Sequence, residues 1–394
     1  MCYVAVDVPI PSPRGSSTHV TGVAKALGSL GADVFVLARR TGPLQPSLEE
    51  FEGFTLRRVY RGIMAPLFSR SAGTPRHSGQ TEDLNARLYR FYLSTVLALY
   101  CGFLAARLIK SNKLSVVIER ETSYGAGALA SLLTGAPLIL EANGPRFSPI
   151  SARRASRVIS YSYSLVGPRL KDKTTLIDSG VDAEAFRPDE VARRAIRSRL
   201  GIGDSPIIGY VGTFQAWHGV DDLIQASGRV LGRYPSARFL MVGPGFEEME
   251  RLTARMGVSA AFVFTGPVSH DVVPQYINAA DVMVSPANPA KGTWTKTHGV
   301  PTQVKVFEYM ACRKPVIVTA TGPMQRLVRD GETGLLVPPG DSSALADAIC
   351  RLLGDNGLAD SMAESGYLQI LEEHTWSEHA KAVLGTIRSA LGGR

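Results

Sequence analysis

Short apolar runs alternate with amphipathic, helix-like segments along almost the whole chain. In the first half, the runs that predict strands are 3–8, 34–38, 116–119, 138–141, 158–160 and 175–177. In the second half, they are 207–211, 238–242, 262–265, 282–285, 316–319 and 334–337. Helical patterns fill the intervals between these runs. Such alternation is typical of parallel sheets that carry helices on both faces.

The alternation stops and restarts once, which indicates two domains. A chain of 394 residues is too long for one ordinary core and suits two domains of about 150–200 residues each. Turn residues cluster at 178–188, where we place the join. We therefore predict an α/β fold of two doubly wound, Rossmann-like domains, 1–183 and 184–375. The last segment, 376–394, is predicted to be a helix that crosses back to the first domain.

One nearly continuous apolar stretch, 91–109, is about long enough to span a bilayer. It contains Ser94, Thr95, Gly102 and Arg107, and polar helical residues precede it. These features favour a buried helix packed on a sheet. A helix in contact with a membrane surface stays open as the alternative.

Composition narrows the functional classes. Hydrophobic residues make up 45% of the chain, with 39 Gly and 24 Pro, as in soluble, loop-rich α/β proteins. The net charge of +8 favours an anionic ligand or an acidic surface, or simply reflects a solvated basic surface. Arg residues cluster at 153–157 and 193–199, but no aromatic residues are interleaved with them, so we predict no nucleic-acid partner. The four Cys are scattered and suggest neither a metal site nor a disulfide framework. The chain begins with a strand pattern, so we predict a cytoplasmic protein.

The most specific chemical signal is the stretch 301–315, where a loop enters a helix. Free backbone N–H groups at such a helix start attract a phosphate. Glu308, about a turn and a half into the helix, can accept hydrogen bonds from a ribose. A phosphate and a ribose together predict a bound nucleotide, held without a metal or other cofactor.

Two further loops follow predicted strands, at the edge where open α/β sheets bind ligands. In the first, Arg14 to Thr18 opens a helix with small residues that let the backbone approach a ligand, although a capped helix start explains it equally. In the second, Gly212 ends a strand and His218 precedes a helix. His218 can contact a diphosphate as a neutral or a cationic donor, or it is an ordinary surface residue.

The ordered series of motifs resembles the GT-B glycosyltransferases of family 4. The motifs are H-G-V-D-D-L-I at 218–224, F-L-M-V-G-P-G at 239–245, the stretch 301–315, G-E-T-G-L-L-V-P-P-G-D at 331–341, and G-S-S-T-H-V at 15–20. The resemblance covers essentially the whole chain. It implies two Rossmann-like domains that face a central cleft, a nucleotide-sugar donor, no metal requirement, and retention of configuration at the anomeric carbon.

The resemblance also implies roles for single residues. Glu308 matches the ribose-binding Glu, and Gln303 and Val304 lie in the loop whose amides hold the diphosphate. Gly15 and Ser16 would close over the phosphates and the sugar, and Val268 falls where the base is contacted.

The chain departs from the family pattern at several positions. Thr213 and His218 stand where many members have an Arg and a Lys on the diphosphate, so we expect the positive charge to come from His218, Lys305, Lys296 or Arg326. Val300 replaces a second Glu. In the family, the first domain often carries a His at the end of its fourth or fifth strand. Here that strand runs into the loop 141–145, so Asn143 is our candidate for the polar group near the reaction. The predicted catalytic residues are Asn143, His218 and Lys305.

Acidic residues near predicted strand ends in the first domain are the candidate acceptor-binding residues: Asp7, Glu119, Glu121 and Glu141. Carboxylates suit a polyol or a cationic amine, although ion pairing with Arg120 or Arg146 explains them as well. The loop E-A-N-G-P at 141–145 is similar to those of aminocyclitol glycosyltransferases in aminoglycoside antibiotic pathways. We therefore expect transfer of a hexose or N-acetylhexosamine from a UDP-sugar to a small polyol or aminocyclitol.

Three alternatives remain open. The positive charge and the stretch 91–109 favour an acceptor glycan or glycolipid at a membrane surface. A Gly-rich turn at 125–127 resembles a dinucleotide fingerprint and suggests an NAD-dependent oxidoreductase, but it begins five residues after its strand, and close helix–strand packing explains the glycines better. A binding module without catalysis would carry the same donor-site sequence.

Overall fold

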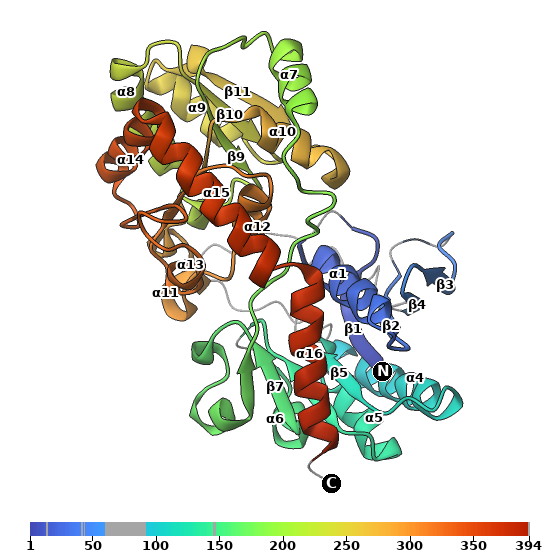
Figure 1. The fold of residues 1–394 in the computed structure, drawn as a ribbon. Helices are drawn as coiled ribbons and strands as arrows, with labels where there is room; N and C mark the ends of the chain where they lie inside the picture. The colour runs from blue at the N-terminus through green and yellow to red at the C-terminus, as the bar shows by residue number, and fades with distance from the viewer. Residues whose placement is uncertain (13–14, 41, 43, 60–91, 145–146, 393–394) are drawn as a thin grey trace. The chain divides into compact units, whose positions relative to one another are not determined.

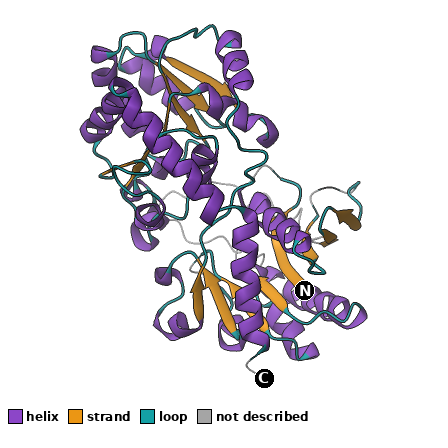
Figure 2. Cartoon of the chain, viewed as in Figure 1, coloured by secondary structure: helices purple, strands orange, loops and turns teal. Residues whose placement is uncertain are grey.

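The computed structural model describes residues 1–12, 15–40, 42, 44–59, 92–144 and 147–392. By its contacts the chain forms two compact units (Figure 1). The first comprises Met1–Ile177 together with His379–Arg394, and the second comprises Asp178–Glu378. Each unit contains its own sheet, with helices packed against the strands (Figure 2).

The sheet of the first unit has the order β3-β4-β2-β1-β5-β6-β7-β8. Its strands are β1 (Cys2–Pro9), β2 (Phe35–Arg39), β3 (Leu48–Phe51), β4 (Phe54–Val59), β5 (Val117–Arg120), β6 (Leu138–Glu141), β7 (Arg157–Ser160) and β8 (Thr174–Leu176). The described strands pair in parallel, except that β3 runs antiparallel to β4 at the sheet edge. The central strands are buried on both faces, which explains their continuous apolar runs.

The main helices of the first unit are α1 (Gly15–Ser29), α4 (Ala98–Ser111), α5 (Ala126–Thr134), α6 (Pro149–Arg154) and α16 (Trp376–Leu391). A π-helical turn, η1 (Leu93–Leu97), leads into α4. The described part of the apolar stretch 91–109 is therefore helical. Its inner face packs on the sheet through Cys101, Ala105 and Ile109, while its outer face is exposed. Within the described residues, no helix is both long and apolar enough to cross a bilayer.

The sheet of the second unit has the order β11-β10-β9-β12-β13-β14, and its strands pair in parallel. They are β9 (Ile207–Val211), β10 (Arg238–Val242), β11 (Phe262–Gly266), β12 (Val282–Ser285), β13 (Val316–Thr319) and β14 (Leu335–Val337). The longer helices are α7 (Glu190–Arg199), α8 (Val220–Arg233), α9 (Glu247–Arg255), α10 (Val273–Ala279), α12 (Val304–Ala311), α14 (Ser342–Gly354) and α15 (Asn356–Glu373). Two short helices, α11 (Thr293–His298) and α13 (Gly322–Leu327), follow β12 and β13.

In each unit, successive strands are added first to one side of the first strand and then to the other. The point where this direction reverses is where open α/β sheets bind ligands. In the second unit, β9 lies between β10 and β12, so the loops after β9 and β12 diverge. In the first, β1 lies between β2 and β5. Open α/β sheets bind ligands in the crevice at the carboxyl ends of such strands.

Candidate functional site

The start of α12 combines a helix N-terminus with buried polar groups that lack partners. Ser285, at the end of β12, donates its hydroxyl to Gln303 Oε1 at 2.5 Å. Gln303 is only 4% exposed, yet its Nε2 has no hydrogen-bond partner. Within the described residues, Thr302 Oγ1 and Thr321 Oγ1 are also buried without a partner. Thr302 and Gln303 directly precede α12, whereas Thr321 is the N-cap residue of α13. An unsatisfied buried polar group costs about 1–3 kcal/mol, so two of them at the start of α12 indicate a ligand site.

Lys305, in the first turn of α12, lies against the loop that follows β9. Its Nζ donates to Tyr210 Oη at 2.9 Å and lies 4.3 Å from the centre of the Tyr210 ring. Burial lowers the pKa of Lys305 to about 7, and the negative charge of Glu308 only partly opposes this. Gly212 makes the approach possible, because at φ +144° an added Cβ would lie 2.6 Å from Lys305 Nζ.

His218 ends the short helical turn η5 (Ala216–His218) before α8. Its Nδ1 lies 3.4 Å from Lys305 Nζ, and the Trp217 ring covers the imidazole at a centroid distance of 3.7 Å. Burial, reinforced by the neighbouring Lys305 charge, lowers the pKa of His218 to about 2. His218 is therefore a neutral imidazole near pH 7. When Lys305 is protonated it can only donate, so Nδ1 then accepts and Nε2 carries the proton as a neutral donor.

Gly219, the residue after His218, brings two ligand-binding loops together. It has φ +66°, and a Cβ there would lie 2.0 Å from the Pro286 carbonyl oxygen, in the loop after β12. In the same place, the Asn288 amide donates to the Trp217 carbonyl at 2.8 Å. The close approach explains the H-G pair of the sequence motif, since only glycine fits.

Glu308 lies in the second turn of α12 and is 7% exposed. Its Oε1 is 2.9 Å from His270 Nε2, in the segment after β11. This hydrogen bond, aided by the carboxylate charge, raises the pKa of His270 although burial opposes it. The sequence analysis did not single out His270. The sequence feature that could have identified His270 is its position two residues after Val268, close to the end of a strand in the donor domain.

The predicted residues of the second unit gather at the carboxyl edge of its sheet. Thr213 is exposed, and its carbonyl accepts from Tyr210 Oη at 2.6 Å. Val268 is half-buried and packs against the core. Val304 is the first residue of α12. Two of the candidate phosphate cations differ in their surroundings: Lys296 is exposed, and Arg326 pairs with Asp178 at 2.9 Å.

In the first unit, Glu141 is the centre of a buried hydrogen-bond network. It accepts from Tyr3 Oη, from His19 Nε2 at 2.5 Å, from Arg120 Nη1 at 3.2 Å and from Asn143 Nδ2 at 2.6 Å. Burial alone would raise the pKa of Glu141, but the charges of His19 and Arg120 and these hydrogen bonds hold it well below its ordinary value. Glu141 is thus an ionised, internally saturated carboxylate.

Glu119 caps a helix. Its Oε1 accepts from the Gly125 amide at 2.7 Å, and its Oε2 accepts from the Ala128 amide and the Ser151 hydroxyl, each at 2.9 Å. Burial raises the pKa of Glu119 to about 7, against the effect of these bonds. The carboxylate therefore occupies the N-terminus of α5. At Gly127 a Cβ would lie 2.6 Å from Glu119 Cβ, so close packing around Glu119 explains the glycines at 125–127.

Asn143 connects two of the predicted acids. Its backbone N–H donates to Glu121 Oε2 at 3.2 Å, while its side-chain Nδ2 donates to Glu141 Oε1. Burial raises the pKa of Glu121, with the charge of Arg120 opposing. Tyr161 donates its hydroxyl to the Asn143 carbonyl at 3.3 Å. Asn143, Glu121 and Glu141 therefore lie together at the carboxyl ends of β5 and β6.

The remaining predicted residues of the first unit lie on β1 and α1. Asp7 is half-buried in β1, and Gly15 and Ser16 form the first turn of α1. The turn is fixed by the Ser17 hydroxyl, which accepts from the Ser12 amide at 3.1 Å. Arg14 and Arg146 lie outside the described residues. No group of three or more His, Cys, Asp or Glu side chains in the described ranges is placed to hold a metal ion.

The chain is similar to known glycosyltransferases. Residues 205–355 match the family model described as Glycosyl transferases group 1. The D-inositol 3-phosphate glycosyltransferase of Acidothermus cellulolyticus is 28% identical over 96% of this chain and 86% of its own. The alpha-D-kanosaminyltransferase of Streptomyces kanamyceticus is 32% identical, over 45% of this chain and 44% of its own. The crystal structure of Anabaena Alr3699/HepE in complex with UDP and glucose has a TM-score of 0.74 at 19% identity, covering 99% of this chain and 100% of that one. This last likeness confirms the predicted fold.

Proposed function

We propose that this chain, a glycosyltransferase of the GT-B fold, transfers a hexose or N-acetylhexosamine from a UDP-sugar to a hydroxyl group of a small polyol or aminocyclitol. The observation that carries the proposal is the start of α12. There, a helix N-terminus, the buried unpartnered polar groups of Thr302 and Gln303, and a lysine with a lowered pKa lie together. This combination suits a diphosphate, which is anionic and accepts many hydrogen bonds.

In the proposed complex, the diphosphate takes up the groups that lack partners. Gln303 Nε2 and the hydroxyls of Thr302 and Thr321 donate to its oxygens, together with the first amides of α12. Lys305 gains a proton from the approach of the anion and becomes the main cation. His218 donates from Nε2 as a neutral group, in the place where relatives of the resembled family have a Lys.

Glu308 is the proposed ribose-binding residue. His270 holds Oε1, so Oε2 is the oxygen that accepts from a ribose hydroxyl. The neighbouring Val268 gives the base an apolar contact at the end of β11. The name of the Anabaena structure includes UDP, which supports uridine as the base in the proposal.

The proposed reaction breaks the bond between the anomeric carbon and the diphosphate oxygen. A hydroxyl oxygen of the acceptor forms the new bond on the same face of the sugar, so the configuration is retained. The hydroxyl proton passes to the departing phosphate oxygen. Lys305, His218 Nε2 and the α12 amides stabilise the negative charge that develops on the leaving diphosphate, and this stabilisation is usually the largest contribution of such a site.

One of the four predicted acceptor-binding acids remains a good candidate. Both carboxylate oxygens of Glu119 accept hydrogen bonds from internal partners, and so do those of Glu141. Glu121, which lies beside Asn143, is therefore the proposed contact for acceptor hydroxyl or ammonium groups. One relative is named for D-inositol 3-phosphate, a polyhydroxylated ring, and this supports the polyol class.

The experiment that tests the donor site is a thermal-shift panel with UDP, GDP, ADP, dTDP and NAD, without added metal. At about a hundredfold excess over Kd, a bound ligand should stabilise the protein by about 2.7 kcal/mol. We expect a shift with UDP, lost in Gln303→Ala and Glu308→Ala and kept in the control Glu332→Ala, a surface carboxylate paired with Arg329. A panel without any nucleoside diphosphate shift contradicts the proposal, and a shift with NAD alone supports the oxidoreductase.

A second candidate, transfer to a glycan or glycolipid at a membrane surface, is favoured by one observation. The outer face of α4 and α5 is both apolar and basic, as described below. The two candidates differ in where the labelled product goes. With a radiolabelled sugar donor and both acceptor classes present, a water-soluble product supports the first candidate, and a product in the organic phase supports the second.

A further inference from the structure

The outer face of α4 carries an apolar stripe that the fold leaves uncovered. Val96, Leu99, Tyr100 and Phe103 follow one another at helical spacing. Their exposed fractions are 51%, 48%, 55% and 58%. The opposite face of the helix already packs on the sheet through Cys101, Ala105 and Ile109. The stripe is therefore a second apolar face, beyond what the core of the unit needs.

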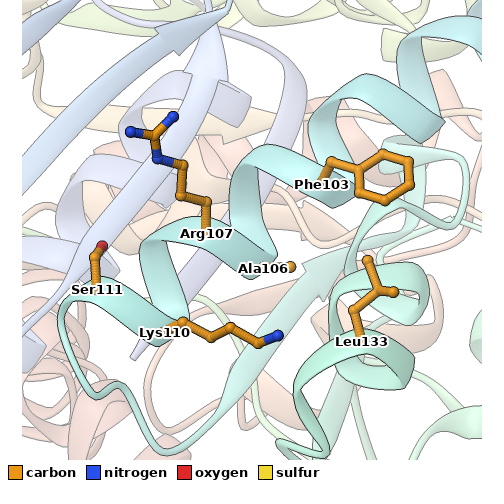
Figure 3. Close-up of a pocket in the computed structure, with 6 residues that line it drawn as sticks. All are labelled: Phe103, Ala106, Arg107, Lys110, Ser111 and Leu133. Carbon is orange, nitrogen blue, oxygen red and sulfur yellow. The ribbon is translucent and has the colours of Figure 1, made fainter.

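The stripe continues onto the neighbouring helix α5. There, Leu132 and Leu133 are 58% and 40% exposed. A groove of about 580 Å³ runs between the two helices, and Figure 3 shows the residues that line it: Phe103, Ala106, Arg107, Lys110, Ser111 and Leu133. In this view, Lys110 extends towards α5, and Phe103 lies on the same side of α4 as Leu133.

Basic residues extend the stripe at its C-terminal end. Arg107 and Lys110 lie one and two turns beyond Phe103, and both are exposed. Lys113 follows in the turn after α4 and is also exposed. The sequence contains no Asp or Glu from 92 to 118, so acidic residues of this segment do not neutralise these cations.

We propose that this α4–α5 face, made of Val96, Leu99, Tyr100, Phe103, Arg107, Lys110, Leu132 and Leu133, docks onto an anionic membrane surface. The aliphatic and aromatic side chains enter the boundary between headgroups and acyl chains, with α4 lying in the membrane plane. Arg107 and Lys110 reach the lipid phosphates with their charged ends and keep their stems on the apolar surface.

Charge favours a lipid surface over a second copy of the chain. In a symmetric pair, each copy would bring the same face to the interface, and the segment 92–118 has no Asp or Glu that could pair with the cations of the other copy. Anionic lipid neutralises them instead. The inference does not depend on the proposed acceptor, because it concerns where the protein resides.

The location of the face within the first unit is compatible with an accessible site. α4 leads directly into β5, so its basic end lies near the amino ends of the strands. The network of Glu141 and Asn143 lies at the carboxyl ends of β5 and β6. The docking face covers the outer sides of α4 and α5 and does not include the carboxyl ends of the strands, so docking leaves the predicted acceptor-binding edge of this unit uncovered.

Vesicle co-sedimentation of the full-length protein tests the proposal. We expect it to sediment with phosphatidylcholine vesicles that contain 30 mol% phosphatidylglycerol, to bind weakly to pure phosphatidylcholine, and to be released by 1 M NaCl. Arg107→Glu and Lys110→Glu should each lower the partition coefficient at least fivefold. Phe103→Ser should also lower it, whereas the control variants Arg169→Glu and Leu368→Ser, exposed residues on other elements, should bind like the wild type.

Equal binding to neutral and anionic vesicles, no binding to either, or unchanged binding of the α4 variants would each overturn the proposal. The wild-type salt and lipid dependence needs no variant, so the test survives a variant that fails to fold. Light scattering provides a further measurement. A dimer that Phe103→Ser dissociates, without vesicle binding by the wild type, would assign the face to a second copy and reject the membrane.

Discussion

Lys305 Nζ lies 3.4 Å from His218 Nδ1, and both groups are buried. Burial lowers the pKa of each residue, and the charge of Lys305 lowers that of His218 further, so the imidazole is neutral at pH 7 and the ammonium releases its proton far more easily than an exposed lysine. Before a ligand binds, the site is thus only partly charged at pH 7. The anion that binds there completes the charge of Lys305.

The first prediction concerns the pH dependence of UDP binding. Because the pKa of free Lys305 is about 7 and a diphosphate favours the protonated form, binding takes up a proton above pH 7. We expect UDP affinity to be constant below pH 7 and to fall about tenfold per pH unit above it, until the pKa of the complex is reached. Calorimetry at pH 6, 7, 8 and 9 measures this.

The variant Lys305→Gln tests whether Lys305 causes this pH dependence of UDP binding. It should bind UDP at least tenfold more weakly at pH 6, and its affinity should not change with pH over this range. Proton uptake can be read from the dependence of the binding enthalpy on the ionisation enthalpy of the buffer. A wild-type affinity that does not vary with pH would exclude Lys305 as the titrating cation.

The second prediction separates a neutral from a charged role for His218. Since the pKa of His218 is about 2, protonation of this residue does not contribute between pH 5 and pH 9. His218→Gln keeps a neutral donor, so kcat should fall only a few-fold, whereas His218→Ala should lose about tenfold or more. If both variants lose activity equally, donation from Nε2 is not its contribution.

The third prediction concerns the contact between His270 and Glu308. The folded-state pKa of His270 is raised, so its contact stabilises the protein at pH values below about 6.5 and is lost as the pH rises through the raised value. His270 is 41% exposed at its side chain, so solvent screening should keep the loss in His270→Ala below about 1 kcal/mol. Urea melts at pH 5.5 and pH 9 measure the difference.

The same variant reports on the donor site. With its Oε1 partner removed, Glu308 is no longer held in place, and KM for the nucleotide-sugar should rise several-fold with little change in kcat. A fall in kcat at unchanged KM would place His270 in the chemical step instead.

The fourth prediction distinguishes a structural from an acceptor-binding role for Glu119. Removing a carboxylate that accepts from two α5 amides and from Ser151 should destabilise the first unit by about 1–3 kcal/mol in Glu119→Ala. The matched control is Glu52→Ala, because Glu52 is an exposed carboxylate paired with Lys25. Thermal unfolding measures the effect. At a temperature where the variant is folded, an unchanged acceptor KM supports capping, and a raised one supports acceptor contact.

Much of the fold follows from the apolar runs, because a strand buried on both faces must be apolar throughout. All twelve predicted strands are present, from β1 to β14. The exceptions are β3 and β4, which the sequence analysis missed. β3 is a half-exposed edge strand whose L-E-E-F pattern carries two carboxylates, and β4 carries two arginines in its T-L-R-R run. Edge strands often carry charges, which protect them from pairing with other chains.

The site was less predictable, because sequence shows which residues lie near strand ends but not what each side chain meets. Glu119 and Glu121 are two residues apart in the sequence, yet they have different partners. Glu119 caps the N-terminus of α5, whereas Glu121 accepts from the Asn143 backbone N–H. His19 reaches Glu141 across 122 residues, and His270 reaches Glu308 across 38. Only the packed structure brings these pairs together.

The return of α16 to the first unit bears on how the protein is made. α16 contributes buried Ala380, Val383 and Ile387, and the Arg157 guanidinium bonds to Ser389 on it. Ribosomes synthesise from the N-terminus, so the first unit emerges first but lacks this helix until the residues of α16 have been added. The second unit is continuous and can finish folding earlier. The order of completion is thus the reverse of the order of synthesis, and during elongation the surface that awaits α16 is the one a chaperone would need to shield.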